Sequence, residues 1–432
     1  MRILLTTTVT AVVVIAAAPP AVAKWATTTR VSVSTTGDQS NDRSDDPAIS
    51  ADGRYVTFDS DASNLVPDDT NGVSDIFVRD RITGTTTRVS VSTTGDQANH
   101  FSRASAISAD GRYVTYQSLA TNLVPDDTND ESDIFVRDRA TGTTSRVSVS
   151  TNEYQANHYS ELPAISADGR YITYHSLATN FVPNDTNSAY DVFVRDQING
   201  TTRRVSVSTT GDQGDGDSFD PAISADGRYV SYTSGASNLV PDDTNDESDI
   251  FVWDRTTGTT RRISVSTTGN QGDNSSFTSV LSADGGYVSY ASDASNLVAD
   301  DTNDATDIFV WNRATGTTRR ISVSTTGNQA NNVSRSPAIS ASARYVTYQS
   351  LATNLVPDDT NGVTDILVRD QITGTTRRVS VSSSGNQANQ HSEFPAISAD
   401  GRYITYQSPA TNLVPDDTNG VTDIFVRNRG GF

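Results

Sequence analysis

Hydrophobic residues in this chain fall into short runs separated by polar segments, and the same arrangement returns along almost the whole sequence. In the first copy, residues 47–50 form one run, and the Asp52-Gly53 pair after it is a strong signal for a tight hairpin turn. Runs rich in β-branched and aromatic residues follow at 55–60, 75–80 and 88–92. No segment after the N-terminal region has a helical period. The pattern therefore predicts four short strands per copy and an all-β fold.

The copies are evenly spaced. The segment ISADGRY begins at Ile49, and it or a close variant returns every 58 residues until Ile397, so that seven units follow one another without insertion or deletion. A second marker, RVSVS or RISVS, begins at Arg30 and has the same period. Repeated four-stranded units bury their faces against one another, and arranging them radially leaves only short strand edges. We therefore expect a seven-bladed β-propeller.

The two ends of the repeat array predict how the ring closes. The seventh unit stops after IFVRNR, one strand short of a full blade, whereas an additional RVSVS segment at 30–34 precedes the first unit. We expect this N-terminal strand to complete the last blade. Such an arrangement removes an exposed strand edge. It also closes the ring without a disulfide, and the sequence contains no cysteine.

The repeat resembles a known family. PAISADGRYVTF followed by DIFVRD is similar to the TolB-type, WD40-like (PD40) propeller repeat of secreted bacterial proteins, and the similarity covers all seven units. The resemblance implies a propeller that serves as a binding scaffold, a peptidase-associated domain or, occasionally, a lyase. Two units depart from the pattern: Gly286 replaces the usual arginine, and Ser342-Ala343 replaces Asp-Gly. We expect these changes to weaken two turns.

The N-terminus and the net charge bear on location and partners. Residues 1–23 have a basic start, an apolar stretch and the small-residue pattern Ala21-Val22-Ala23, which predicts a signal peptide followed by a single propeller domain at 24–432. A secreted or periplasmic monomer with no membrane span is expected. The net charge of −20 disfavours nucleic acid and favours cations.

The loop VPDDTNGVSD between the second and third strands invites two interpretations. Asp69, Asn71 and Asp75 align with the third, fifth and ninth positions of a calcium loop, but Pro67 stands where the first ligand would be. Alternatively, these side chains hold the loop together by bonding to the backbone and to the start of the third strand, and this is the interpretation we favour. The candidate calcium ligands of the seven copies are Asp69, Asn71, Asp75, Asp127, Asn129, Asp133, Asp185, Asn187, Asp191, Asp243, Asn245, Asp249, Asp301, Asn303, Asp307, Asp359, Asn361, Asp365, Asp417, Asn419 and Asp423.

The loop that joins one blade to the next varies where the loop between second and third strands does not, because one of its positions holds four different residue types among the seven copies. A position that varies from blade to blade can form one asymmetric site over the central channel, although drift in a solvated loop gives the same variation. This position holds Asp45, Arg103, Glu161, Phe219, Phe277, Arg335 and Glu393.

Two functions follow from these observations. The first is a binding scaffold that presents its acidic long-loop face to a protein or glycan partner, with calcium as an expected cofactor if the loops bind it. The alternative is a metal-dependent lyase or hydrolase acting on a polysaccharide through His100, His158 and His391, which lie in loops entering the second, third and seventh blades. No nucleophile motif supports catalysis, so the binding function is the one we expect.

Overall fold

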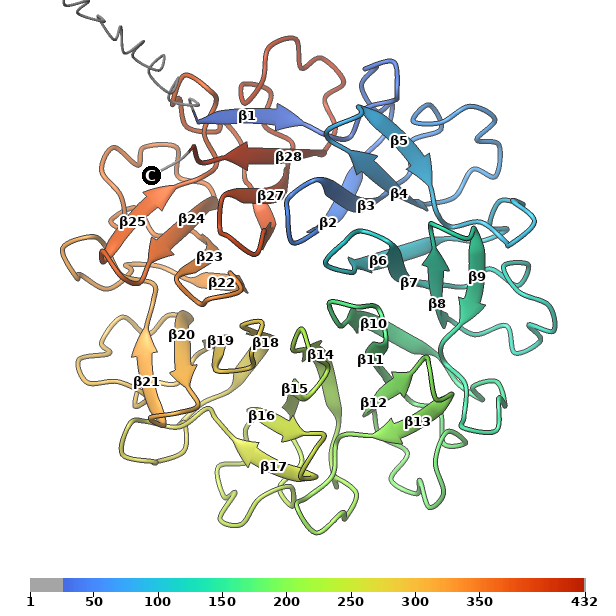
Figure 1. The fold of residues 1–432 in the computed structure, drawn as a ribbon. Coiled ribbons are helices and arrows are strands. Elements are labelled where there is room, and N and C mark those ends of the chain that lie inside the picture. Colours follow the sequence, from blue (N-terminus) through green and yellow to red (C-terminus); the bar gives the residue numbers. More distant parts are fainter. Residues whose placement is uncertain (1–25, 431–432) are drawn as a thin grey trace, which may run out of the picture.

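The structure of the protein is a computed structural model that describes residues 26–430. Over this range the chain forms seven four-stranded antiparallel sheets arranged as blades around a central opening (Figure 1). The seven-bladed propeller expected from the 58-residue period is confirmed. The signal-peptide prediction lies outside the described residues.

Each blade runs from an inner strand beside the opening to an outer strand at the rim of the disc. The inner strands are β2 (Ser44–Ile49), β6 (Ser102–Ile107), β10 (Ser160–Ile165), β14 (Ser218–Ile223), β18 (Ser276–Leu281), β22 (Ser334–Ile339) and β26 (Glu393–Ile397). The second strands are β3 (Tyr55–Ser60), β7 (Tyr113–Ser118), β11 (Tyr171–Ser176), β15 (Tyr229–Ser234), β19 (Tyr287–Ser292), β23 (Tyr345–Ser350) and β27 (Tyr403–Ser408). The third strands are β4 (Asp75–Asp80), β8 (Asp133–Asp138), β12 (Asp191–Asp196), β16 (Asp249–Asp254), β20 (Asp307–Asn312), β24 (Asp365–Asp370) and β28 (Asp423–Asn428). The outer strands are β5 (Thr85–Arg88), β9 (Thr143–Arg146), β13 (Thr201–Arg204), β17 (Thr259–Arg262), β21 (Thr317–Arg320), β25 (Thr375–Arg378) and β1 (Thr27–Arg30).

The second and third strands have the bounds that the sequence predicted. The inner strand, expected at 47–50, covers Ser44–Ile49, and the outer strand differs more. It was expected at 88–92 and instead ends at Arg88, which faces Phe77 of β4. Beyond Arg88 the chain turns back on itself, so that Val91 forms a bridge with Gln97. The alternating residues of RVSVS therefore hold a turn together rather than extend the sheet.

The ring closes as expected, although the closing strand is also displaced. β1 covers Thr27–Arg30, not 30–34, and pairs with β28 from Thr27 opposite Asn428 to Arg30 opposite Phe425. The last sheet accordingly has the order β1-β28-β27-β26. The first and last strands of the described residues thus share one blade (Figure 1).

Adjacent blades pack face to face, and each interface has its own apolar cluster. Between the first and second blades, for example, Ile76 and Val78 of β4 contact Val114 and Tyr116 of β7 and Phe135 of β8, all of them buried. Six further clusters of the same kind occur among the described residues. Repeating one interface around the ring explains how a long chain is stabilised without one large core.

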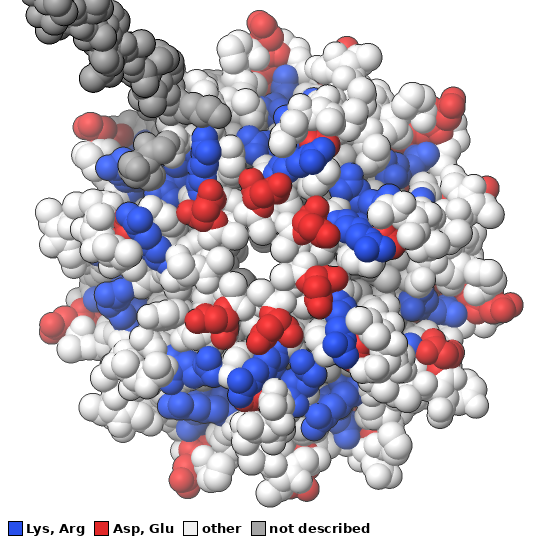
Figure 2. Space-filling view, viewed as in Figure 1, with Lys and Arg blue, Asp and Glu red and all other residues white. Residues whose placement is uncertain are grey.

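The tight turns between inner and second strands lie together on one face of the disc. Gly53 has φ of 72°, and a Cβ added there would lie 2.2 Å from Cδ2 of Tyr403 in the preceding blade. A side chain at Gly53 is therefore disfavoured twice, by the backbone conformation and by the close neighbour. In the sixth blade Ala343 adopts φ of 58° at this position, so the turn is retained. Figure 2 shows this face, with acidic side chains around the opening and basic side chains further out.

Candidate functional site

The candidate calcium ligands surround an arginine in every blade. In the first blade, Nη1 of Arg88 lies 2.8 Å from Oδ1 of Asp69 and 3.1 Å from Oδ2 of Asp75. These three side chains are nearly buried, so the guanidinium neutralises both carboxylates where water cannot. The equivalent arginines are Arg30, Arg146, Arg204, Arg262, Arg320 and Arg378.

The amides of the same loop make bonds that fix its shape. Nδ2 of Asn71 donates to Oδ2 of Asp75 at 2.8 Å and to the carbonyl of Ala98 at 3.1 Å. Asn64 accepts from the amide of Asn41 and donates to the carbonyl of Gln39, which ties the loop to the one entering the blade. These contacts favour the structural interpretation of the loop. Calcium binding there stays a prediction.

Burial changes the titration of these carboxylates. It raises the pKa of Asp133 to about 6, although Ser148 and Arg146 lower it by hydrogen bonding and charge. Burial likewise raises the pKa of Asp191 and of Asp249 to about 6.

The glycine of the loop, Gly72 in the first blade, is replaced by Asp130 in the second blade, where φ is 56°. The left-handed turn that this loop needs is therefore preserved without glycine.

The three histidines of the enzyme hypothesis lie in loops. Nδ1 of His100 accepts the amide hydrogen of Phe101, and Nδ1 of His158 accepts that of Tyr159, while His391 is exposed. Within residues 26–430 no group of three or more His, Asp or Glu side chains is placed to hold a metal ion. A catalytic role for these histidines stays a prediction.

The variable residues lie at the starts of the inner strands, at the end of the channel that carries the long loops. Asp45, for example, is the second residue of β2 and faces Asp59 of β3. Each inner strand has a bulge just after this position, and the residue that follows it has a positive φ. A bulge re-aims side chains at a strand end and is frequent beside functional sites. We call these paired positions the channel rim: Asp45 and Asp46, Arg103 and Ala104, Glu161 and Leu162, Phe219 and Asp220, Phe277 and Thr278, Arg335 and Ser336, Glu393 and Phe394.

Second-strand residues of the preceding blade hold several of these bulges in place. Oε1 of Gln117 accepts the amide hydrogen of Leu162 at 2.9 Å, and Oε1 of Gln349 accepts that of Phe394 at the same distance. Gln407 does the same for Asp46. The bulge is therefore built across the blade interface, which lends the channel rim rigidity.

One sector of the channel rim is acidic. Asp59 is buried, and its pKa is raised well above the usual range by burial and by Asp46 and Asp45. The pKa of Asp45 is also raised by burial, while Arg43 and Arg103 oppose this. Arg103 belongs to the next blade, so side chains from neighbouring blades act on one another here. Asp59 was not singled out from the sequence, because strand alternation alone does not reveal which residue of the second strand lies next to the channel rim.

Other sectors are apolar or contain histidine. Leu162 and Phe394 are 44% and 45% exposed at the bulges of the third and seventh blades. His175 of β11 is 5% exposed, and its Nε2 lies 3.8 Å from a carboxylate oxygen of Glu161. Its ring also lies edge-on to Tyr190, with the ring centroids 5.2 Å apart. The variation seen in the sequence thus produces a rim whose chemistry changes around the ring.

Comparison with solved structures gives the following matches. An oligogalacturonate lyase in complex with manganese is 14% identical, with 93% of this chain and 92% of that chain covered and a TM-score of 0.56. The β-propeller domain of the trilobed protease from Pyrococcus furiosus is 10% identical, with 94% of each chain covered and a TM-score of 0.53. TolB from Acinetobacter baumannii is 15% identical, with 70% of this chain covered and a TM-score of 0.41, and this chain spans 58% of that TolB.

The blades and the repeat decide the fold. The chain is a seven-bladed β-propeller with four antiparallel strands in each blade. At identities this low, the likeness to the lyase and to the protease domain shows the fold alone and assigns neither activity. No protein-family model matches the chain, and no curated protein does either. Residues 26–430 contain no helix of the length and apolar character that a membrane crossing requires.

Proposed function

We propose that this protein is a secreted or periplasmic binding propeller, acting as a monomer, whose channel rim holds a protein or glycan partner. The proposal rests on one contrast: the loops between second and third strands are alike in all blades, and the channel rim is not. The loops between second and third strands have the same arginine-centred structure in every blade, whereas the channel rim changes from acidic to apolar to basic around one opening. A rigid scaffold with one varied surface is typical of binding propellers.

The proposed location rests on the N-terminal sequence, and the place given to calcium rests on the contacts of the long loops. Export rests on the signal-peptide pattern of residues 1–23, and the net charge of −20 makes a nucleic-acid partner unfavourable. Calcium at the long loops would have to displace an arginine from two carboxylates, so we place it behind the structural role of these residues.

The experiment compares two matched pairs of substitutions. The protein and the double variant Leu162→Ser/Phe394→Ser are labelled and applied to peptide and polysaccharide arrays. The control is Ile82→Ser/Ile372→Ser, which removes two residues that are 74% and 75% exposed in the tight turns of the opposite face. We expect the unsubstituted protein and the control to bind the same peptides or polysaccharides, and the rim variant to lose this binding. Equal loss in both variants, or no saturable binding by the protein itself, would refute the proposal.

The enzyme alternative has its own outcome. Metal-dependent release of unsaturated sugar ends from a polysaccharide, abolished by combined alanine substitution of His100, His158 and His391, would establish a lyase in place of a binding protein. A hydrolase would release reducing ends with the same dependence. We place both second because the described residues offer no cluster of metal-ligating side chains.

A further inference from the structure

The tight-turn face carries a row of grooves between adjacent blades, and most of them are filled by an arginine. Between the first and second blades, Cζ of Arg139 lies 4.5 Å from the ring centroid of Tyr55, and Nη1 donates to the carbonyl of Gly111 at 2.5 Å. The guanidinium is thus held by a ring of the preceding blade and by a turn of its own blade. Four further stacks of this kind occur in the described part of the chain: Arg81 on Tyr403, Arg255 on Tyr171, Arg313 on Tyr229 and Arg429 on Tyr345, at 4.0 to 4.4 Å.

Two grooves lack this arginine, because the third and sixth blades have Gln197 and Gln371 at the corresponding positions. Each of these grooves contains a cavity. The one between the second and third blades has a volume of about 450 Å³ and is lined by Tyr113, Gly169 and Gln197, among others. The one between the fifth and sixth blades has a volume of about 440 Å³ and is lined by Tyr287 and Gln371, among others. The cavities therefore lie where the other grooves hold an arginine side chain.

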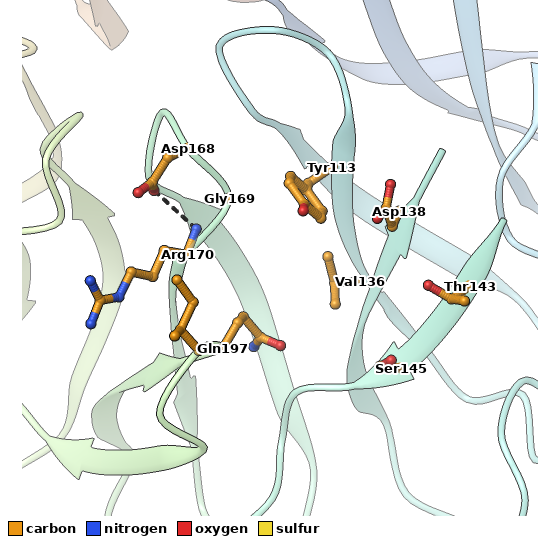
Figure 3. A pocket seen from close by; sticks show the side chains of 10 residues that line it. Tyr113, Val136, Asp138, Thr143, Ser145, Asp168, Gly169, Arg170 and Gln197 are labelled. Carbon is orange, nitrogen blue, oxygen red and sulfur yellow. Dashed lines mark hydrogen bonds between the residues drawn. The ribbon is translucent and has the colours of Figure 1, made fainter. Parts of the chain in front are cut away.

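The groove between the second and third blades keeps the other groups that surround an arginine elsewhere. Tyr113 has Arg112 over its ring at 4.7 Å, as Tyr55 has Arg54, but no arginine of the third blade covers it. Asp138 and Asp168 line the cavity (Figure 3). Nε2 of Gln197 is buried and has no hydrogen-bond partner.

The two carboxylates correspond to aspartates that favour the charged form of the arginines in the filled grooves. Burial lowers the pKa of Arg139, and Asp80, the counterpart of Asp138, opposes this. Burial also lowers the pKa of Arg81, and the charge of Asp52, the counterpart of Asp168, opposes this. Figure 3 also shows the side chain of Arg170 directed away from the cavity, where it pairs with Asp196 at 2.8 Å. Asp138 pairs with Arg112 at 2.7 Å, but Asp80 pairs with Arg54 in the same way beside the groove that Arg139 fills. The groove therefore keeps the surroundings that hold a guanidinium elsewhere, without an arginine of the chain in it.

The second cavity lacks these features. Asn312 and Ser342 replace the two carboxylates, and Gly286 replaces the arginine beside the ring. Gln371 donates to the carbonyl of Ala343 at 2.5 Å and accepts from Nη2 of Arg319 at 2.5 Å. This groove already holds the guanidinium of Arg319 and has lost both carboxylates, which makes it a negative control within the same chain.

We propose that the groove between the second and third blades is a binding site for the guanidinium of an arginine in a partner polypeptide. The open face of Tyr113 provides the cation–π contact, the carbonyl of Gly169 provides an acceptor like the one that Gly111 offers Arg139, and the carboxylates of Asp138 and Asp168 provide negative charge. A planar guanidinium can lie flat on the ring while its edge donates hydrogen bonds, whereas the compact lysine ammonium has no flat face to stack. The site lies on the face opposite to the channel rim and does not depend on what the channel rim binds.

The test uses arginine and lysine with both backbone ends blocked, and a blocked Gly-Arg-Gly peptide, each titrated into the protein and followed by calorimetry and saturation-transfer NMR. We expect the arginine compounds to bind at least tenfold more tightly than blocked lysine. Gln197→Arg, which restores the side chain found in five other blades, should weaken binding at least tenfold and raise the melting temperature. Gln371→Arg should leave binding unchanged.

The outcomes separate clearly. Loss of binding on Gln197→Arg with retention on Gln371→Arg supports the site. If Gln197→Arg does not fold, Tyr113→Leu replaces it and should also weaken binding at least tenfold. Absence of saturable arginine binding to the protein, equal binding of lysine, or unchanged binding by Gln197→Arg would overturn the proposal. Binding of free arginine but not of the peptide would assign the groove to a small molecule and would also refute it.

Discussion

Nη1 of Arg146 lies 3.1 Å from Oδ2 of Asp133, inside the second blade and almost out of contact with solvent. The same nitrogen lies 3.0 Å from Oδ1 of Asp127. One arginine therefore satisfies two of the carboxylates that the sequence marks as candidate calcium ligands. Removing one partner of such a buried set leaves a charge without compensation, which is far more costly than the set is favourable.

Arg146→Met should consequently destabilise the protein by about 3 kcal/mol, because Asp127 and Asp133 lose their counter-ion. Urea unfolding followed by circular dichroism measures this. Calcium added to the chelated variant should restore part of the stability, whereas the unsubstituted protein should show no change in melting temperature with calcium. A clear calcium-dependent rise in the melting temperature of the unsubstituted protein, with several ions bound per chain, would instead support calcium loops.

The pH dependence of stability follows from two groups of carboxylates with opposite shifts. Burial raises the pKa of Asp133, Asp191 and Asp249 to about 6, above the ordinary value of 3.8 for an aspartate. The folded state then binds protons more tightly than the unfolded state, so this contribution to stability is present below about pH 4 and is lost as the pH rises through about 6. The hydrogen bond from Arg54 holds the pKa of Asp80 below its usual range. The ionised form of Asp80 therefore stabilises the folded state, and this stabilisation is lost only as the pH falls well below about 4.

We therefore expect the melting temperature to be highest near pH 4 to 5 and to fall towards pH 7, a direction that relief of the net charge of −20 reinforces. Calorimetric scans between about pH 3 and 8 measure the profile. The triple variant Asp133→Asn/Asp191→Asn/Asp249→Asn should have a flatter profile between about pH 4 and 7. A melting temperature that rises steadily towards pH 7 would contradict the assignment of raised pKa values.

Removal of the closing strand should weaken the whole ring. Deletion of residues 24–34 takes away β1, exposes the edge of β28 and removes Val31 from the apolar cluster between the seventh and first blades. We expect a lower melting temperature and concentration-dependent association, because an unpaired strand edge recruits other chains. Light scattering and thermal unfolding test this against a protein that begins at residue 24. Unchanged unfolding after the deletion would show that β1 does not close the ring in solution.

Two glycines with similar backbone conformation should differ in their tolerance of alanine. Gly227 has φ of 67°, and an added Cβ would lie 2.1 Å from Cδ2 of Tyr171 in the preceding blade. Gly211 has φ of 91°, and an added Cβ would have no neighbour within 4 Å. Gly211→Ala should cost roughly 1 to 2 kcal/mol through conformation alone. Gly227→Ala should cost about 1 to 3 kcal/mol more, because the tyrosine must move. Equal losses of stability by urea unfolding would show that the blades adjust freely.

Much of the fold and little of the site could be predicted before the structure was known. The period around Ile49, the Asp52-Gly53 turn and the missing last strand together predicted the blades, their number and the closure of the ring. The outer strand was misplaced because RVSVS has the alternation of a strand, although Val91 pairs back onto Gln97 instead. Strand alternation is a local property, and the competition between a turn and a sheet edge is decided by neighbouring segments.

The architecture follows from the sequence, because an unbroken 58-residue repeat with a period-two pattern leaves few ways to bury each unit except against its copies. Which side chains contact one another depends instead on tertiary packing. Arg146 meets Asp127 across a loop, Gln117 supports the bulge at Leu162 in the next blade, and Arg139 covers Tyr55 of the preceding one. These partners lie 19, 45 and 84 residues apart in the chain. Their contacts depend on how strands and blades pack together, which a linear pattern of hydrophobic and polar residues does not specify.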